Sequence, residues 1–87
     1  MKLNGNFALR KICDVYYAVP LGESSKKIKG MIKLNDTGAF IWEKIEKGLS
    51  DTEIITALSE KFGISQEVAS EDFAEFTNAL KEVEILV

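Results

Sequence analysis

The sequence predicts an α+β fold of winged-helix type, in which an N-terminal three-stranded antiparallel sheet precedes a helix-turn-helix bundle of three helices. The apolar residues alternate or are rich in β-formers between residues 7 and 34, and they follow a helical repeat from residue 35 onward. The expected helices are joined only by Gly48-Leu49 and Gly63-Ile64, and such tight corners are typical of helix-turn-helix units. A chain of 87 residues is too short for two domains, so we expect one domain spanning residues 1–87.

Three strands are expected, at about residues 7–12, 14–19 and 27–34. Pro20 is expected to close the second strand, because proline has no N–H to donate. The third strand alternates most clearly, with Ile28, Gly30, Ile32 and Leu34 on one face and Lys27, Lys29, Met31 and Lys33 on the other. Brief connections between consecutive strands predict an antiparallel meander.

Three helices are expected, at about residues 36–47, 51–62 and 66–83. Asn35, Ser50 and Ser65 precede them and are residue types that cap helix N-termini. Ser50 and Glu53 have the spacing of a capping box, in which each side chain bonds the backbone N–H of the other residue. The apolar tail 85–87 is expected to fold back onto the core.

The composition argues against an enzyme that acts alone. The chain has no histidine, which removes His-based acid–base catalysis, nucleophile–histidine pairs and Cys/His zinc sites. Its one cysteine, Cys13, excludes an internal disulfide and fits a reducing compartment. The first ten residues lack the apolar core of a secretory signal, and apolar runs are too short to span a membrane. We therefore expect a cytoplasmic protein with no cofactor, no metal and no membrane contact.

The net charge of −3 is unevenly distributed along the chain. Residues 1–33 carry seven basic and two acidic residues, a net +5, and residues 34–87 carry four basic and twelve acidic residues, a net −8. The acidic total argues against nucleic-acid binding, which depends on neutralising phosphates. The basic zone leaves room for an acidic segment of a partner, although both charged zones are also compatible with simple solvation of a surface.

Two single residues each have a structural and a functional interpretation. The apolar stripe expected on the last helix comprises Val68, Ala69, Phe73, Phe76, Ala79, Leu80 and Val83. Asp72 lies within this stripe, between Ala69 and Phe76. Its carboxylate is expected either to bond a helix N-terminus or a lysine, or to act as a polar anchor beside a groove. Cys13 lies in or beside a strand turn and is expected to be a packed or exposed thiol rather than a nucleophile. The aromatic residues at helical spacing are expected to form the core.

The third strand is a candidate binding edge. An edge strand presents unpaired N–H and C=O groups and can accept a strand from another chain. Gly30 reduces side-chain cover, and Met31 is an apolar residue on the lysine face that a peptide side chain can contact. Lysines on such an edge also protect against aggregation, so the lysines alone do not indicate a peptide-binding edge.

The stretch from residue 30 to residue 42 (GMIKLNDTGAFIW) resembles the strand-to-helix signature of the PqqD-like family. The later EDFAEF motif at residues 71–76, with Leu80 and residues 85–86, resembles the third helix and tail of that family, over a similarity from about Phe7 to Leu86. The family usually has glycine at the position of Glu84.

The resemblance implies a non-catalytic recognition domain for ribosomally synthesised, modified peptides. Such domains bind the leader of a precursor peptide and present its core to a modifying enzyme, often a radical S-adenosylmethionine enzyme. In the family the leader adds as a strand to the third strand and lies against the third helix. The implied peptide-binding residues here are Lys29, Gly30, Met31, Ile32, Lys33, Asp72, Phe73, Phe76, Thr77 and Leu80.

Two other functions share this architecture. A winged-helix DNA-binding regulator needs a basic recognition helix, whereas the expected second and third helices are predominantly acidic. A structural adaptor could instead dimerise through the same strand edge. We expect a monomer or weak homodimer whose partners are the leader peptide and the modifying enzyme.

Overall fold

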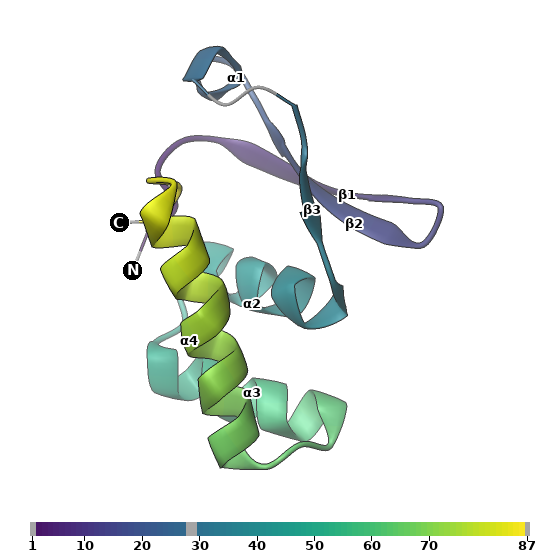
Figure 1. Cartoon of the computed structure of the whole chain (residues 1–87), viewed down its shortest axis with the longest axis vertical. Coiled ribbons are helices and arrows are strands. Elements are labelled where there is room, and N and C mark those ends of the chain that lie inside the picture. The colour runs from purple at the N-terminus through teal and green to yellow at the C-terminus, as the bar shows by residue number, and fades with distance from the viewer. Residues whose placement is uncertain (1, 28–29, 87) are drawn as a thin grey trace.

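The computed structural model describes residues 2–27 and 30–86. It contains β1 (Phe7–Ile12), β2 (Val15–Pro20), α1 (Ser24–Lys27), β3 (Ile32–Leu34), α2 (Asp36–Glu46), α3 (Asp51–Phe62) and α4 (Gln66–Glu82). Figure 1 shows the sheet at one end, α3 at the other, α2 between them, and α4 running along the length of the molecule. The predicted α+β fold class is therefore confirmed.

The sheet is an antiparallel meander in the order β1-β2-β3. The β1–β2 hairpin turns at Cys13 and Asp14, which both have positive φ (50° and 64°), as a type I′ turn requires. β2 extends one residue further than predicted, because Pro20 pairs with Phe7 of β1. Proline fits there because β3 reaches only to the level of Ala18, so no strand faces the missing N–H of Pro20.

The predicted third strand at residues 27–34 is too long, and the predicted loop before it contains an additional helix. β3 comprises only Ile32–Leu34, and the four residues of α1 end at Lys27. Gly30 has φ +84°, a conformation that does not continue an extended strand. Residues 28 and 29 of the predicted strand lie outside the described residues.

The three longer helices begin where the capping residues predict. The side chains of Asn35, Ser50 and Ser65 accept hydrogen bonds from the backbone N–H three residues later. The capping box is complete, since the backbone N–H of Ser50 donates to Oε1 of Glu53 at 2.9 Å. α3 has the predicted bounds, and α2 and α4 each end one residue earlier than predicted.

Trp42 on α2 is the largest fully buried side chain among the described residues and joins the sheet to the helices. Its ring meets Phe7 of β1 edge to face, with centroids 5.2 Å apart. Ile54 and Leu58 of α3 and Ala69 and Phe73 of α4 complete the other side of this core. The predicted stripe of α4 is wrong at both ends, because Val68 and Val83 are exposed.

The C-terminal tail packs beside the N-terminus, as predicted for Ile85 and Leu86, which are both buried. Leu86 forms a β-bridge with Leu3, and the backbone N–H of Asn4 donates to the carbonyl of Ile85 at 2.6 Å. The predicted third tail residue, Val87, lies outside the described residues. Within the described part of the tail, no residue pairs with β3.

Among the described residues, no helix is both long and apolar enough to cross a bilayer.

Candidate functional site

β3 lies at an edge of the sheet and pairs with β2 only, within the described part of the chain. Because the turn has two residues, Ile12 and Val15 form a hydrogen-bonded pair. Every second residue of β2, beginning with Val15, therefore directs its N–H and C=O toward β1. The intervening residues of β2 face β3, where they pair with Ile32 and Leu34. The N–H and C=O of Lys33 consequently point away from the sheet, toward the open edge.

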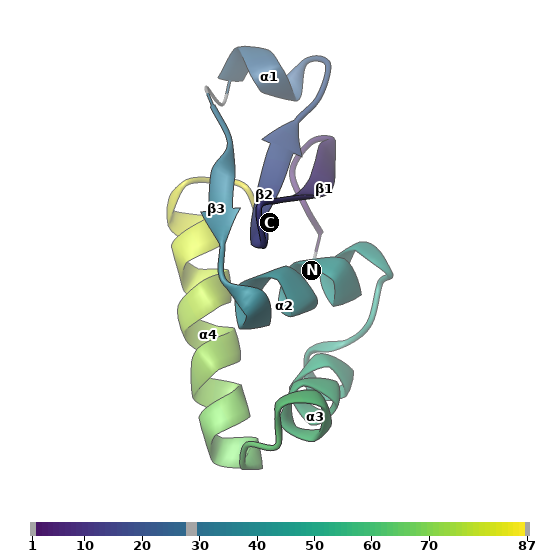
Figure 2. The same cartoon turned by 90° about the vertical axis from the view of Figure 1, so that its right-hand side faces the viewer.

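A hollow of about 390 Å³ lies between the first turn of α2, directly after β3, and the middle of α4. Figure 2 shows β3 and α4 on the same side of the molecule, with the start of α2 next to them. The hollow is lined by Asn35, Thr37, Gly38, Asp72, Glu75, Phe76 and Ala79. The open strand edge therefore adjoins a concave surface of suitable size for one or two peptide side chains.

The predicted contacts on α4 divide into two groups. Asp72 and Phe76 are half-buried and line the hollow. Phe73, Thr77 and Leu80 are buried, each no more than 6% exposed, and the Thr77 hydroxyl donates to the carbonyl of Phe73 at 2.9 Å. These three residues support the hollow from beneath, and their side chains offer little surface to a ligand.

Of the five predicted peptide contacts around the third strand, the structure places only two in β3. Ile32 and Lys33 belong to β3, whereas Met31 precedes it and is 53% exposed. Gly30 lies in the bend before β3 and is not a mid-strand residue. Lys29 lies outside the described residues.

The sequence interpretation missed Asn35, Thr37, Gly38, Glu75 and Ala79 as lining residues. The sequence did contain one signal, the glycine at position 38. Glycine inside a helix costs about 1 kcal/mol relative to alanine and usually has a packing reason. A side chain at Gly38 would place its Cβ 2.9 Å from Cε1 of Phe76. The glycine thus permits α4 to approach the start of α2.

The lining combines an aromatic surface with carboxylates. Asp72 and Glu75 project from consecutive turns of α4, and neither forms an ion pair or a hydrogen bond with another described residue. The predicted bond from Asp72 to a helix N-terminus or a lysine is therefore not found within residues 2–27 and 30–86. Among these residues there is also no cluster of metal-ligating side chains. The arrangement favours an extended chain with apolar and basic side chains.

The family model of coenzyme PQQ synthesis protein D (PqqD) matches residues 21–86. The chain belongs to the PqqD family. The match includes β3, all three long helices and every lining residue of the hollow, whereas β1 and β2 precede it. The resemblance carried by residues 30–42 and 71–76 is thereby confirmed.

The PqqD fold is also found in a solved structure described as TbiB1 in complex with the TbiA(beta) leader peptide. The TM-score is 0.76, the sequence identity is 23%, and the similarity covers 99% of this chain and 94% of the other. β1 therefore belongs to the shared fold although it lies outside the PqqD family match. Among curated proteins, none matches this chain.

Proposed function

We propose that this PqqD-family protein is a non-catalytic adaptor that binds the leader of a ribosomally synthesised precursor peptide as an additional strand on β3. The observation that carries the proposal is the outward-facing main chain of Lys33, which lies two residues before the hollow between α2 and α4 begins at Asn35. A PqqD-type fold has been solved with a leader peptide, which supports this choice of ligand.

Main-chain pairing supplies affinity that depends little on sequence, and side-chain pockets supply selectivity. β3 is only three residues long, so few main-chain bonds are available and the hollow must contribute much of the selectivity. Phe76 offers an apolar contact, and Asp72 and Glu75 favour a basic side chain. The preferred leader therefore carries a basic and an apolar residue in the segment that passes α4.

The adaptor acts by raising the local concentration of the substrate. A leader bound by this protein and by a modifying enzyme holds the peptide core near the catalytic centre of that enzyme. In this family the enzyme is often of the radical S-adenosylmethionine type, and we propose such a partner here. The protein itself catalyses no covalent change. We propose that it works as a monomer or weak homodimer in the cytoplasm.

The test compares two substitutions at Lys33, with a fluorescently labelled leader peptide as the probe. Lys33→Pro removes the outward N–H without removing a bond to β2, whereas Lys33→Ala removes the charge and keeps the N–H. Loss of a main-chain bond costs about 1 kcal/mol, so we expect the proline variant to bind about five- to tenfold more weakly than the alanine variant.

Equal affinities of the two variants contradict strand addition. Hydrogen exchange of the wild-type protein provides a second measurement that does not depend on folding of the proline variant. We expect exchange of the Lys33 amide to slow when the leader is bound, and an unchanged rate contradicts the proposal. Sedimentation without peptide tests the alternative adaptor, since a stable dimer through β3 would occupy the same edge.

A further inference from the structure

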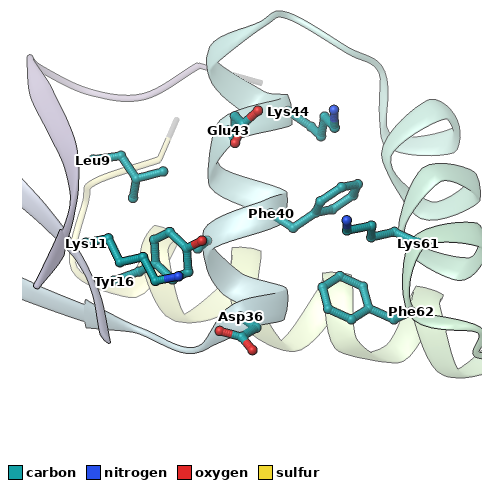
Figure 3. Close-up of a pocket in the computed structure, with 10 residues that line it drawn as sticks. Leu9, Lys11, Tyr16, Asp36, Phe40, Glu43, Lys44, Lys61 and Phe62 are labelled. Atoms are coloured by element: carbon teal, nitrogen blue, oxygen red, sulfur yellow. The ribbon is translucent and has the colours of Figure 1, made fainter. Parts of the chain in front are cut away.

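A second, larger hollow lies on the other side of α2, between the β1–β2 hairpin and α3. Its volume is about 630 Å³, within the range of about 300–1,000 Å³ that is usual for ligand pockets. Figure 3 shows α2 along its back wall, Leu9 and Tyr16 of the hairpin on one side, and Phe62 of α3 on the other. It has no lining residue in common with the hollow next to β3.

The floor of this second hollow is aromatic. Phe40 of α2 and Phe62 of α3 meet edge to face, with ring centroids 5.7 Å apart. Both rings are only half-buried, as are Leu9 and Tyr16. Apolar surface that the core does not cover is thus gathered in one concave site, where it can hold a large apolar or aromatic side chain.

Three lysines surround the floor. Nζ of Lys44 lies 4.9 Å from the ring centroid of Phe40, and Nζ of Lys11 lies 5.3 Å from that of Tyr16, both within cation–π range. Figure 3 shows Lys61 extending from α3 toward Phe40. Within the described part of the chain, neither Lys44 nor Lys61 forms an ion pair with a carboxylate.

The acidic residues of the hollow offset these charges only in part. Glu43 pairs with Lys47, which lies outside the hollow, at 3.2 Å. Asp36 is the other carboxylate in the lining, and it belongs to the first turn of α2, where the helix dipole favours a negative charge. Lys11 likewise pairs with Asp14, outside the hollow, at 4.0 Å. Lys44 and Lys61 against Asp36 therefore leave the hollow with a net positive charge in a protein whose net charge is −3.

We propose that this lysine-rimmed hollow docks an acidic segment of the modifying enzyme, and that this segment inserts one aromatic or large apolar side chain between Phe40 and Phe62. The inference rests on the proposed function, because an adaptor must contact its enzyme through a surface that the leader does not occupy. The leader is a poor occupant, since the groove that it enters next to β3 carries Asp72 and Glu75 and selects basic side chains.

The test uses a synthetic nine-residue peptide of Asp and Glu with one central Phe, added to the isotope-labelled protein and followed by NMR. We expect the amide signals of Phe40, Lys44 and Phe62 to shift.

Lys61→Glu should weaken binding about tenfold, because it turns an attraction into a repulsion. Lys26→Glu, on the exposed α1, is the matched control and should change the affinity less than about twofold. Replacing the central Phe of the peptide by Ala should also weaken binding.

Several outcomes overturn the inference. These are equal affinity of the two charge-reversal variants, equal affinity of the Phe and Ala peptides, or shifts confined to residues 32–38. Two further outcomes show other occupants and also overturn it: concentration-dependent shifts of the same amides without peptide indicate a second copy, and displacement by an oligonucleotide indicates nucleic acid.

Leader titrations separate this inference from the proposed function. If Lys61→Glu binds the leader with unchanged affinity but no longer binds the acidic peptide, the two sites are independent. Leader binding by the wild-type protein without binding of the acidic peptide overturns the docking site alone. Absence of leader binding overturns the proposed function and, with it, the enzyme as occupant.

Discussion

The ring of Phe76 occupies the space that a side chain at Gly38 would need. A Cβ at Gly38 would lie 2.9 Å from Cε1 and 3.2 Å from Cδ1 of this ring, and 2.9 Å from Oδ1 of the capping residue Asn35. Both residues line the hollow next to β3, so this close approach of α4 to the first turn of α2 shapes the proposed leader groove.

Gly38→Ala is expected to destabilise the protein although alanine favours helix. Overpacking against Phe76 costs about 1–3 kcal/mol and helix propensity returns about 1 kcal/mol, so the expected net loss is about 1 kcal/mol. In the Phe76→Ala background only the contact with Oδ1 of Asn35 remains, so the same substitution should destabilise less. Urea unfolding of the four proteins measures this coupling, and additive effects of the two substitutions contradict the packing argument.

α4 ends in a Schellman motif in which the left-handed residue is Glu84. Its φ is 60°, its N–H bonds the carbonyl of Lys81 at 3.1 Å, and the N–H of Ile85 bonds the carbonyl of Leu80 at 2.9 Å. α2 ends with the same two hydrogen bonds around Gly48, where φ is 81°. Glutamate thus occupies a position that favours glycine, which the family usually has there.

Glu84→Gly should therefore stabilise the protein by about 1 kcal/mol, because it relieves the left-handed backbone and removes a negative charge from a helix C-terminus. For a domain of this size the melting temperature should rise by about 4–8 °C. Glu82→Gly, two residues earlier and inside the helix, is the matched control and should lower it. A melting temperature of Glu84→Gly at or below wild type is inconsistent with this explanation.

The hairpin turn also uses residues that fit it poorly. Type I′ turns favour Asn-Gly because both central residues have positive φ, yet Cys13 and Asp14 stand there. Cys13→Asn combined with Asp14→Gly should stabilise the protein by about 0.5–1 kcal/mol, measured by thermal unfolding. Cys13→Ser keeps the strained conformation and should give no gain. If the double variant and Cys13→Ser have the same melting temperature, backbone strain in the turn is not significant.

The capping box of α3 should make stability depend on pH. The backbone N–H of Ser50, and next its hydroxyl, hold the pKa of Glu53 below its usual 4.5, with a small opposing effect of desolvation. A carboxyl group with a lowered folded-state pKa stabilises the protein above its usual pKa and loses this contribution as the pH falls through the folded-state value.

Glu53→Gln should therefore flatten the decline in stability between about pH 5 and pH 3, as measured by urea unfolding at each pH. Glu60→Gln, on the same helix and outside the capping box, should leave that decline close to wild type. A wild-type slope in the Glu53→Gln variant argues against a role for the carboxylate.

Local interactions explain why much of the fold could be predicted from sequence. α3 begins and ends at the predicted residues because Ser50 caps its start and Gly63 adopts the left-handed conformation after its end. β1 also has its predicted bounds. In each case the deciding contacts join residues that are close in sequence.

The predictions that failed depended on contacts between distant segments. Alternation alone suggested a long third strand, but pairing with β2 extends only from Ile32 to Leu34, and Gly30 bends the chain before it. The stripe of α4 looked continuous in sequence, yet Val68, Ala79 and Val83 are exposed because neighbouring elements cover only part of this face. For the hollow next to β3 the sequence indicated only Asp72, Phe76 and the glycine at position 38, and it gave no indication of the hollow between the hairpin and α3.

The sequence by itself thus determined the three longer helices, the hairpin and the family, because caps, turns and periodicity act over a few residues. Only the tertiary structure decided where the sheet stays open, which side chains line each hollow and which lysines lack partners. Those features depend on how distant elements approach one another, and the free energy of that approach is set by packing across the whole molecule.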